Sequence, residues 1–180
     1  MKTKLFFWIF LFCLVISYGQ TEQLKVDTKA SKIKYKGDHL LHSWEGINKK
    51  VYGLAVYNIE DKIINKLAIL VYVRDFDSKN SGRDAHSLEV LEALKYPEVR
   101  FYSEKIEIEE NQLIITGNFN FHGIQVEKQL IAQLNFEEKK WELFGNFQLT
   151  PTDFNIDLPS FLSVKMEDLL EIEYHIVFKN

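Results

Sequence analysis

Residues 81–101, SGRDAHSLEVLEALKYPEVRF, hold the densest group of chemically versatile side chains in the sequence. Arg83, Asp84 and His86 occupy three of four consecutive positions. An arginine, a carboxylate and an imidazole together can exchange protons or hold an anion. A helix N-terminus at this point would add free N–H groups that attract phosphate. Asp84, however, would place its own negative charge at that end, so the motif is a weak signal for an anion site.

A helix start explains the same stretch without any chemistry. Ser81 and Asp84 fit the Ser-x-x-acid pattern in which the first residue caps a helix and the fourth reaches back to it. Pro97 then disfavours helix at the residue before it. We therefore predict an amphipathic helix near residues 83–94 and a mainly structural role for Asp84. The apolar face of this helix would be formed by Ala85, Leu88, Leu91 and Leu94.

The segment HLLHSWEG offers a second set of reactive side chains. His39 and His42, followed by Glu45, could hold zinc if they lay on one face of a helix. The flanking residues read as strand or loop, and in an extended strand positions i and i+3 face opposite ways. Adjacent His42 and Ser43 would also point apart, which disfavours a nucleophile–base pair. We predict no metal and no cofactor, although an enzyme using His39, His42, Glu45 or His86 stays open as an alternative.

Alternating polarity dominates the rest of the chain and predicts strands. In LIITGNFNF, Leu113, Ile115, Phe119 and Phe121 share one parity and polar residues share the other. The same pattern recurs in QLIAQLNF, WELFGNFQL and LLEIEYHIVF. Earlier strands are predicted at residues 32–38, 49–57, 66–73 and 98–107. About eight such strands joined by short turns indicate an all-β antiparallel sandwich or closed barrel, and closure would remove the exposed edges.

The apolar parity of these strands should face the inside of a barrel. An eight-stranded barrel is just wide enough to hold one slender ligand. The segment LAILVYV, residues 67–73, is apolar on both parities, so we expect the helix to cover its second face. The predicted lumen residues are Leu67, Ile69, Val71, Phe101, Leu113, Ile115, Phe119, Phe121, Leu130, Leu134, Leu143, Phe147, Ile172, Tyr174 and Ile176.

The first 19 residues read as an export signal. Two lysines precede an apolar run over residues 5–16, and Ser-Tyr-Gly supplies the small residues of a cleavage site. The run is too short to span a bilayer comfortably. Residues 20–180 are then one domain's length of chain, and Cys13, the single cysteine, leaves with the signal. The domain therefore has no disulfide or cysteine ligand.

Charge excludes some partners. The formal net charge is −4 at pH 7, and it becomes more negative once the signal is removed. Such a chain lacks the basic face that nucleic acid requires. No later segment has a transmembrane-length apolar run, and the sequence carries no signal for an oligomeric state.

Four stretches in order resemble the YceI-like family of periplasmic lipid-binding proteins. RDAHSLEVLEALKYPEVRFYS is similar to that family's Arg-Asp-Ala-His segment followed by Lys-Tyr-Pro and a Phe-x-Ser strand. ITGNFNFHGIQVEKQLIAQLNF resembles its His-Gly strand pair. KIKYKGDHLLHSWEGINKKVYGLAVY resembles its opening segment, and LTPTDFNI its late turn, with Pro151 and Asn155 where arginine and glycine are common. The resemblance covers residues 24–179.

This resemblance implies a lipocalin-like barrel whose lumen takes a long apolar chain, such as a polyisoprenoid or a fatty-acid derivative. It implies no catalytic residue, and it places the exported protein in the periplasm as a carrier or store. Arg83, His86 and His122 are the candidates for head-group contacts at the mouth. His122, beside Gly123 at a strand end, otherwise reads as a turn residue. Because many inward candidates are large, a solid-core barrel acting through protein partners is the alternative.

Overall fold

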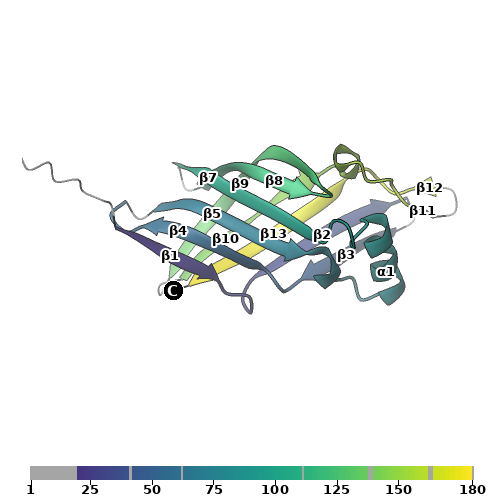
Figure 1. Ribbon diagram of the computed structural model, residues 1–180, viewed down its shortest axis with the longest axis horizontal. Coiled ribbons are helices and arrows are strands. Elements are labelled where there is room, and N and C mark those ends of the chain that lie inside the picture. Colours follow the sequence, from purple (N-terminus) through teal and green to yellow (C-terminus); the bar gives the residue numbers. More distant parts are fainter. Residues whose placement is uncertain are drawn as a thin grey trace, which may run out of the picture.

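The computed structural model describes residues 20–40, 42–61, 63–110, 112–137, 140–161 and 164–179. The predicted export signal, residues 1–19, lies outside these ranges. One helix and the strands are arranged as an elongated barrel (Figure 1). The strands are β1 (Thr21–Val26), β2 (Lys32–His39), β3 (His42–Asn48), β4 (Tyr52–Asn58), β5 (Ile63–Tyr72), β6 (Phe76–Asp77), β7 (Glu98–Glu109), β8 (Gln112–Phe121), β9 (Ile124–Glu137), β10 (Lys140–Leu149), β11 (Ser160–Phe161), β12 (Val164–Lys165) and β13 (Leu170–Lys179), and the helix is α1 (Ser81–Val90).

The wall is an eight-stranded antiparallel barrel. At three places around the barrel, two short strands lie end to end and together take the place of one long strand. β1 and β2 both pair with β13, β3 continues into β4, and β5 continues through a 3₁₀ turn (Val73–Asp75) into β6. β4 pairs with β1 and β5, while β3 pairs with β2 and β6. The remaining strands follow in the order β5-β7-β8-β9-β10-β13. The β1–β13 pairing closes the circle, which confirms the predicted fold class.

One end of the barrel is filled by side chains. Leu24 and Phe178 are fully buried there, and the Tyr57 and Trp141 rings lie 4.9 Å apart between their centroids. The Phe136 ring packs against Trp141, with 4.8 Å between the ring centroids and 42° between the ring planes. This aromatic plug blocks the end at which the β4–β5, β7–β8 and β9–β10 turns lie.

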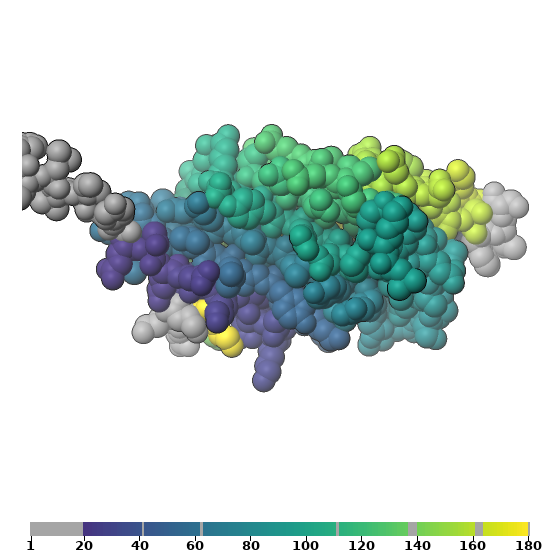
Figure 2. Space-filling view, viewed as in Figure 1, coloured from purple at the N-terminus to yellow at the C-terminus, as the bar shows by residue number. Residues whose placement is uncertain are grey.

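The opposite end carries α1 and, farther out, the β11–β12 hairpin (Figure 1). In Figure 2 the residues of α1 stand out from the surface at this same end. The prediction that the helix covers the second face of residues 67–73 is therefore wrong. That outer face instead carries cross-strand neighbours such as Tyr52, whose ring packs edge-on against Tyr72 at 6.1 Å. Between β5 and α1 the chain passes through the 3₁₀ turn and β6, so the helix begins beyond the end of β5.

The helix occupies a shorter span than predicted, and a different residue caps it. Asn80, in extended conformation, accepts a hydrogen bond from the backbone N–H of Arg83, so Asn80 rather than Ser81 is the N-cap. The helix ends at Val90 because Glu92 adopts a left-handed conformation with φ 42°. The N–H groups of residues 92 and 93 then bond to the carbonyls of residues 89 and 88, which is a Schellman motif without glycine.

The structure agrees with some of the predicted strand boundaries and differs from others. β2 and β7 begin at the predicted residues, Lys32 and Glu98. β4 begins at Tyr52 rather than at residue 49, because the side chain of Asn48 accepts a hydrogen bond from the N–H of Lys50 and the strand is interrupted between β3 and β4. The short strands β1, β3 and β6 were not predicted as separate elements.

Candidate functional site: an apolar cavity in the barrel

The barrel encloses a cavity of about 690 Å³. This volume is typical of pockets that hold a small molecule or cofactor. Its wall consists mainly of aliphatic and aromatic side chains from the barrel strands, with α1 and the segment before β11 closing one end. The large side chains Phe101, Phe119, Phe121, Phe147 and Tyr174 line this space rather than filling it, so the lumen is not solid.

All but two of the predicted lumen residues lie on the cavity wall. Leu113 is buried in the core at the plugged end, and Leu134 packs against the same core; neither contributes to the wall. Both have inward parity, but their side chains pack into the core. The residues that do line it are Leu67, Ile69, Val71, Phe101, Ile115, Phe119, Phe121, Leu130, Leu143, Phe147, Ile172, Tyr174 and Ile176.

Sequence reasoning missed the lining residues that come from other elements. Ile33 and Tyr35 of β2 and Trp44 of β3 line the cavity. The alternation of Ile33 and Tyr35 within the predicted strand 32–38 could have identified them. Leu88 of α1 and Leu158 before β11 also contribute, and no local pattern assigns either residue to a barrel lumen.

Of the three predicted mouth residues, the structure brings two to the cavity. Arg83 and His86 of α1 lie on its wall at the helix end. His122 does not. Its buried ring donates a hydrogen bond from Nδ1 to the carbonyl of Phe154 (2.8 Å) and stacks against Tyr96 at 4.4 Å. The His122 Nε2 atom lies 3.3 Å from a carboxylate oxygen of Glu92. His122 therefore joins the β8–β9 turn to its neighbouring loops.

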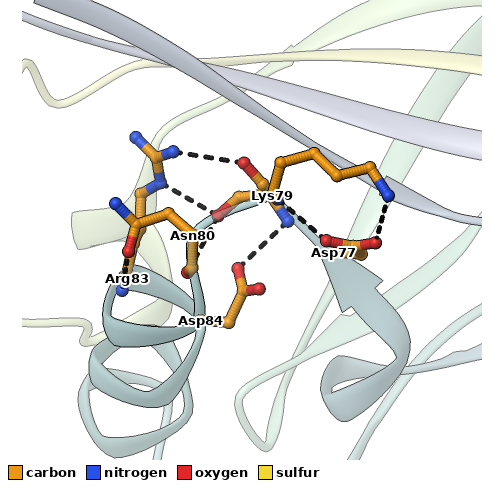
Figure 3. A network of polar contacts seen from close by, with 6 residues as sticks. Asp77, Lys79, Asn80, Arg83 and Asp84 are labelled. Atoms are coloured by element: carbon orange, nitrogen blue, oxygen red, sulfur yellow. Dashed lines mark hydrogen bonds and ion pairs between the residues drawn. The ribbon is translucent and has the colours of Figure 1, made fainter.

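Arg83 and Asp84 both hold one residue of the preceding loop (Figure 3). Asp84 Oδ1 accepts a hydrogen bond from the backbone N–H of Ser78 at 3.1 Å. The Arg83 guanidinium donates to the hydroxyl of Ser78 at 2.9 Å and to its carbonyl at 3.2 Å. Together with the Asn80 cap, these bonds fix the start of α1. Asp84 thus stabilises the helix start, by a bond to Ser78 rather than by the predicted pairing with Ser81.

Tyr35 connects this helix start to the barrel. Burial raises the pKa of Tyr35, and the negative charge of Asp84 acts in the same direction while Arg83 opposes it. A β-carbon at Gly46 would lie 2.4 Å from the Tyr35 ring, so only glycine leaves room for the ring to cross β3. The helix therefore depends on contacts in β2 and β3 as well as on its own cap.

The histidine pair lies differently from the prediction. His39 ends β2 and His42 begins β3, so the two residues are directly opposed across a hairpin and share a face. Their ring centroids are 5.5 Å apart, and both side chains line the cavity. Treating residues 39–42 as one continuous strand was wrong. His39 Nε2 donates to the carbonyl of Val164 at 3.1 Å, which joins the hairpin to β12.

Glu45 faces away from both histidines. It lies on the opposite parity of β3, pairs with Lys34 (3.7 Å), and borders a groove outside the barrel. Within the ranges the structure describes, no cluster of three or more histidine, cysteine or acidic side chains could hold a metal ion. Of the four residues in the enzyme alternative, His39, His42 and His86 line the cavity, whereas Glu45 lies outside it. In the same ranges, no helix is long and apolar enough to cross a membrane.

Tyr174 is the principal polar group deep in the cavity wall. Burial raises its pKa to about 12, and its hydroxyl donates to the carbonyl of Ile131 at 2.9 Å. The lumen below the mouth is otherwise apolar, so it can exclude water around a hydrocarbon but offers little to orient a polar substrate.

Comparison with known proteins identifies relatives over most of the chain. Residues 24–178 match the YceI-like domain family. A UPF0312 protein of Photorhabdus laumondii is 26% identical over 137 residues, which cover 70% of this chain and 71% of the relative. A protein YceI of Salmonella newport is 26% identical over 117 residues, covering 62% of this chain and 61% of that protein.

Solved structures with a similar fold come from several bacteria. BcnA of Burkholderia cenocepacia has a TM-score of 0.75 at 18% identity, with 84% of this chain and 98% of that chain covered. A polyisoprenoid binding domain from Saccharophagus degradans has a TM-score of 0.71 at 7% identity, covering 87% and 97%. The YceI protein of Campylobacter jejuni gives 0.65 at 20% identity, covering 78% and 87%. These similarities show the shared fold.

Proposed function

Because the chain belongs to the family of YceI-like domains, we propose that it is a non-enzymatic binding protein that holds a long apolar chain, a polyisoprenoid or a fatty-acid derivative, in the barrel lumen. The observation that carries the proposal is the apolar cavity of about 690 Å³ inside the barrel. The polyisoprenoid binding domain from Saccharophagus degradans has the same fold and supports this class of ligand.

The apolar wall alone can hold such a ligand. Burial of apolar surface contributes about 25 cal/mol per Å², so every 100 Å² of hydrocarbon removed from water stabilises the complex by roughly 2.5 kcal/mol. The cost of immobilising the chain reduces the net affinity. A slender molecule with its tail against Ile115, Leu143 and Ile176 needs no polar anchor at the plugged end. Its head would lie near α1.

Arg83 and His86 are the proposed head-group residues, because they lie on the wall where the cavity reaches α1. The Arg83 guanidinium already holds Ser78, so it is oriented in advance. An oriented cation at the mouth would favour a phosphorylated or carboxylate head over a neutral one. His122 is too engaged with Phe154 and Tyr96 for this role.

Export to the periplasm and transport or storage of the lipid are also part of the proposal. They are supported by the charged start and apolar run of residues 1–19. Fractionation of the native host should then find the protein without residues 1–19 in the periplasmic fraction. Recovery of the uncleaved chain in the cytoplasm would contradict this.

The binding proposal is tested by native mass spectrometry of the protein purified from its own host envelope. We expect a bound species whose mass, after release into organic solvent, is that of an apolar lipid. Ile115→Trp should reduce its occupancy, because Ile115 lines the cavity and a larger ring occupies the space of the chain. Ile114→Trp, one residue away on the outer face, is the matched control. A protein free of lipid that also fails to bind added polyisoprenoids and fatty acids would refute the proposal.

A further inference from the structure

Between β9 and β10 the ladder covers only part of the length of the two strands. β8 pairs with β9 from Gln112–Gln133 to Phe121–Ile124, and β10 pairs with β13 from Trp141–Phe178 to Leu149–Leu170. β9 and β10 pair only from Lys140–Glu137 to Phe144–Gln133. Among the described residues, no ladder pair joins 124–132 of β9 to 145–149 of β10. We call this stretch of the wall the β9–β10 seam.

Side chains bridge the seam in place of a ladder. The Tyr174 hydroxyl reaches across β10 from β13 and donates to the carbonyl of Ile131 on β9 at 2.9 Å. The Lys128 ammonium donates to the carbonyl of Gln148 at 2.9 Å and lies 5.1 Å from the centre of the Phe147 ring. These bonds satisfy carbonyls that a ladder would otherwise occupy.

Gly145 makes the Tyr174 bridge possible. A β-carbon at residue 145 would lie 2.5 Å from the Tyr174 hydroxyl and 2.5 Å from the Ile131 carbonyl oxygen. Gly145 follows Phe144, the last residue of β10 that pairs with β9. The bridge therefore stands where the two strands separate, and the seam runs from it toward the α1 end of the barrel.

Both edges of the seam belong to the cavity wall. Leu130 on β9 and Phe147 and Leu149 on β10 line the cavity. At the α1 end of the barrel, Leu88 of α1 and Leu158 before β11 also form part of the wall, so a chain leaving there would have to pass these side chains. An apolar chain leaving sideways would pass between apolar edges and would have to break the two side-chain bonds that cross the seam among the described residues.

We propose that the β9–β10 seam is a lateral gate through which the apolar chain enters and leaves the lumen, with Tyr174 and Lys128 as its latches. This inference rests on the proposed function and adds the route of exchange. Each latch is a side-chain bond that rotates open by itself, whereas a ladder opens only when several backbone bonds break together. A gate of this kind would admit a flexible hydrocarbon and exclude a bulky rigid ligand.

The test measures exchange rates by stopped-flow fluorescence with a polyene fatty acid, cis-parinaric acid. Tyr174→Phe and Lys128→Met each remove one latch and keep the apolar part of the side chain. Loss of one such bond should speed both uptake and release about three- to tenfold. In Lys128→Met, whose position is outside the cavity wall, the dissociation constant should stay nearly unchanged. Tyr57→Phe, in the aromatic plug away from the cavity, is the matched control and should exchange at the wild-type rate.

A disulfide across the seam tests the gate in the opposite direction, because it should slow exchange. Extending the β9–β10 register beyond Phe144–Gln133 places Gln148 opposite Gln129, and a disulfide between cysteines at these positions should slow exchange until it is reduced. A disulfide between residues 148 and 171, which are already ladder partners, should not. Unchanged rates in Tyr174→Phe and Lys128→Met, or a seam disulfide without effect, would overturn the gate while binding itself persists. Absence of any parinaric acid binding in the wild type would instead count against the proposed function.

Discussion

Removal of the Asp84 carboxylate should lower stability without abolishing ligand binding. Asp84 accepts a hydrogen bond from the N–H of Ser78, and Ser78 is buried. In Asp84→Ala this N–H loses its partner, which costs about 1–3 kcal/mol. The loss of a negative charge in the first helical turn adds about 0.3–1 kcal/mol. Together the two contributions amount to about 1.3–4 kcal/mol, and because Asp84 is only partly buried we expect the lower half of that range, roughly 1.3–2.6 kcal/mol.

This energy corresponds to a measurable change in melting temperature. For a domain of this size each kcal/mol shifts the midpoint by about 2–4 °C, so Asp84→Ala should melt roughly 3–10 °C below the wild type. The measurement is thermal unfolding followed by circular dichroism, with urea unfolding to check that the denaturant dependence is unchanged. Asp84→Asn retains an acceptor oxygen, so its melting temperature should lie between those of the wild type and Asp84→Ala. Glu89→Ala, on the exposed side of the same helix, is the control.

Ligand binding separates the structural role from the others. The folded fraction of Asp84→Ala should bind cis-parinaric acid with nearly wild-type affinity, because the apolar wall is unchanged. A variant that melts at the wild-type temperature but has lost binding or a catalytic activity would refute the reasoning. Asp84 would then act on a ligand or substrate, and the hydrogen bond to Ser78 would be incidental.

Four further outcomes are expected. Phe119→Asp places a charge in the apolar wall and should abolish either lipid uptake or folding, so a soluble variant with normal lipid uptake would show that Phe119 does not face the ligand. Arg83→Ala should weaken binding of phosphorylated isoprenoids and spare the neutral alcohols, as titrations of matched pairs would show; equal losses for both would remove the head-group role. The pKa of Tyr174 is about 12 when folded and about 10 when unfolded, so the unfolded chain releases the proton first and stability should fall as the pH rises from 10 toward 12. Tyr174→Phe should lack that part of the fall in urea titrations, and an identical pH dependence would contradict the assignment. Elemental analysis of protein from its host should find no stoichiometric metal; zinc removable only by a chelator with loss of activity would reopen the enzyme alternative.

The sequence by itself determined the fold class and most of the cavity wall. Alternation over residues 113–121 and 170–178 assigns inward parity to residues such as Ile115 and Ile176, because strand side chains alternate whatever the neighbouring strand is. The position of the helix followed from polar residues before an apolar periodic run. These signals are local, so they survive without knowledge of which segments meet.

Only the tertiary structure decided which predicted residues come together. His39 and His42 share a face because a hairpin turns between them, and a turn of this length is hard to distinguish from a continuous strand in the sequence. Asn80 and Ser81 are both good capping residues, and the path of the loop after β6 selected Asn80. The helix ends early because Glu92, rather than a glycine, takes the left-handed conformation.

The cavity and the seam in its wall also depend on the assembled barrel. Leu113 and Leu134 have the same parity as the lining residues, yet their side chains pack into the core and do not line the cavity. Tyr174, Gly145 and Ile131 come from three strands, and their contact depends on where the β9–β10 ladder stops. Parity is a property of one strand and can be read from its residues. Depth, register and the ends of a ladder are relations between strands, so they are fixed only when the barrel closes.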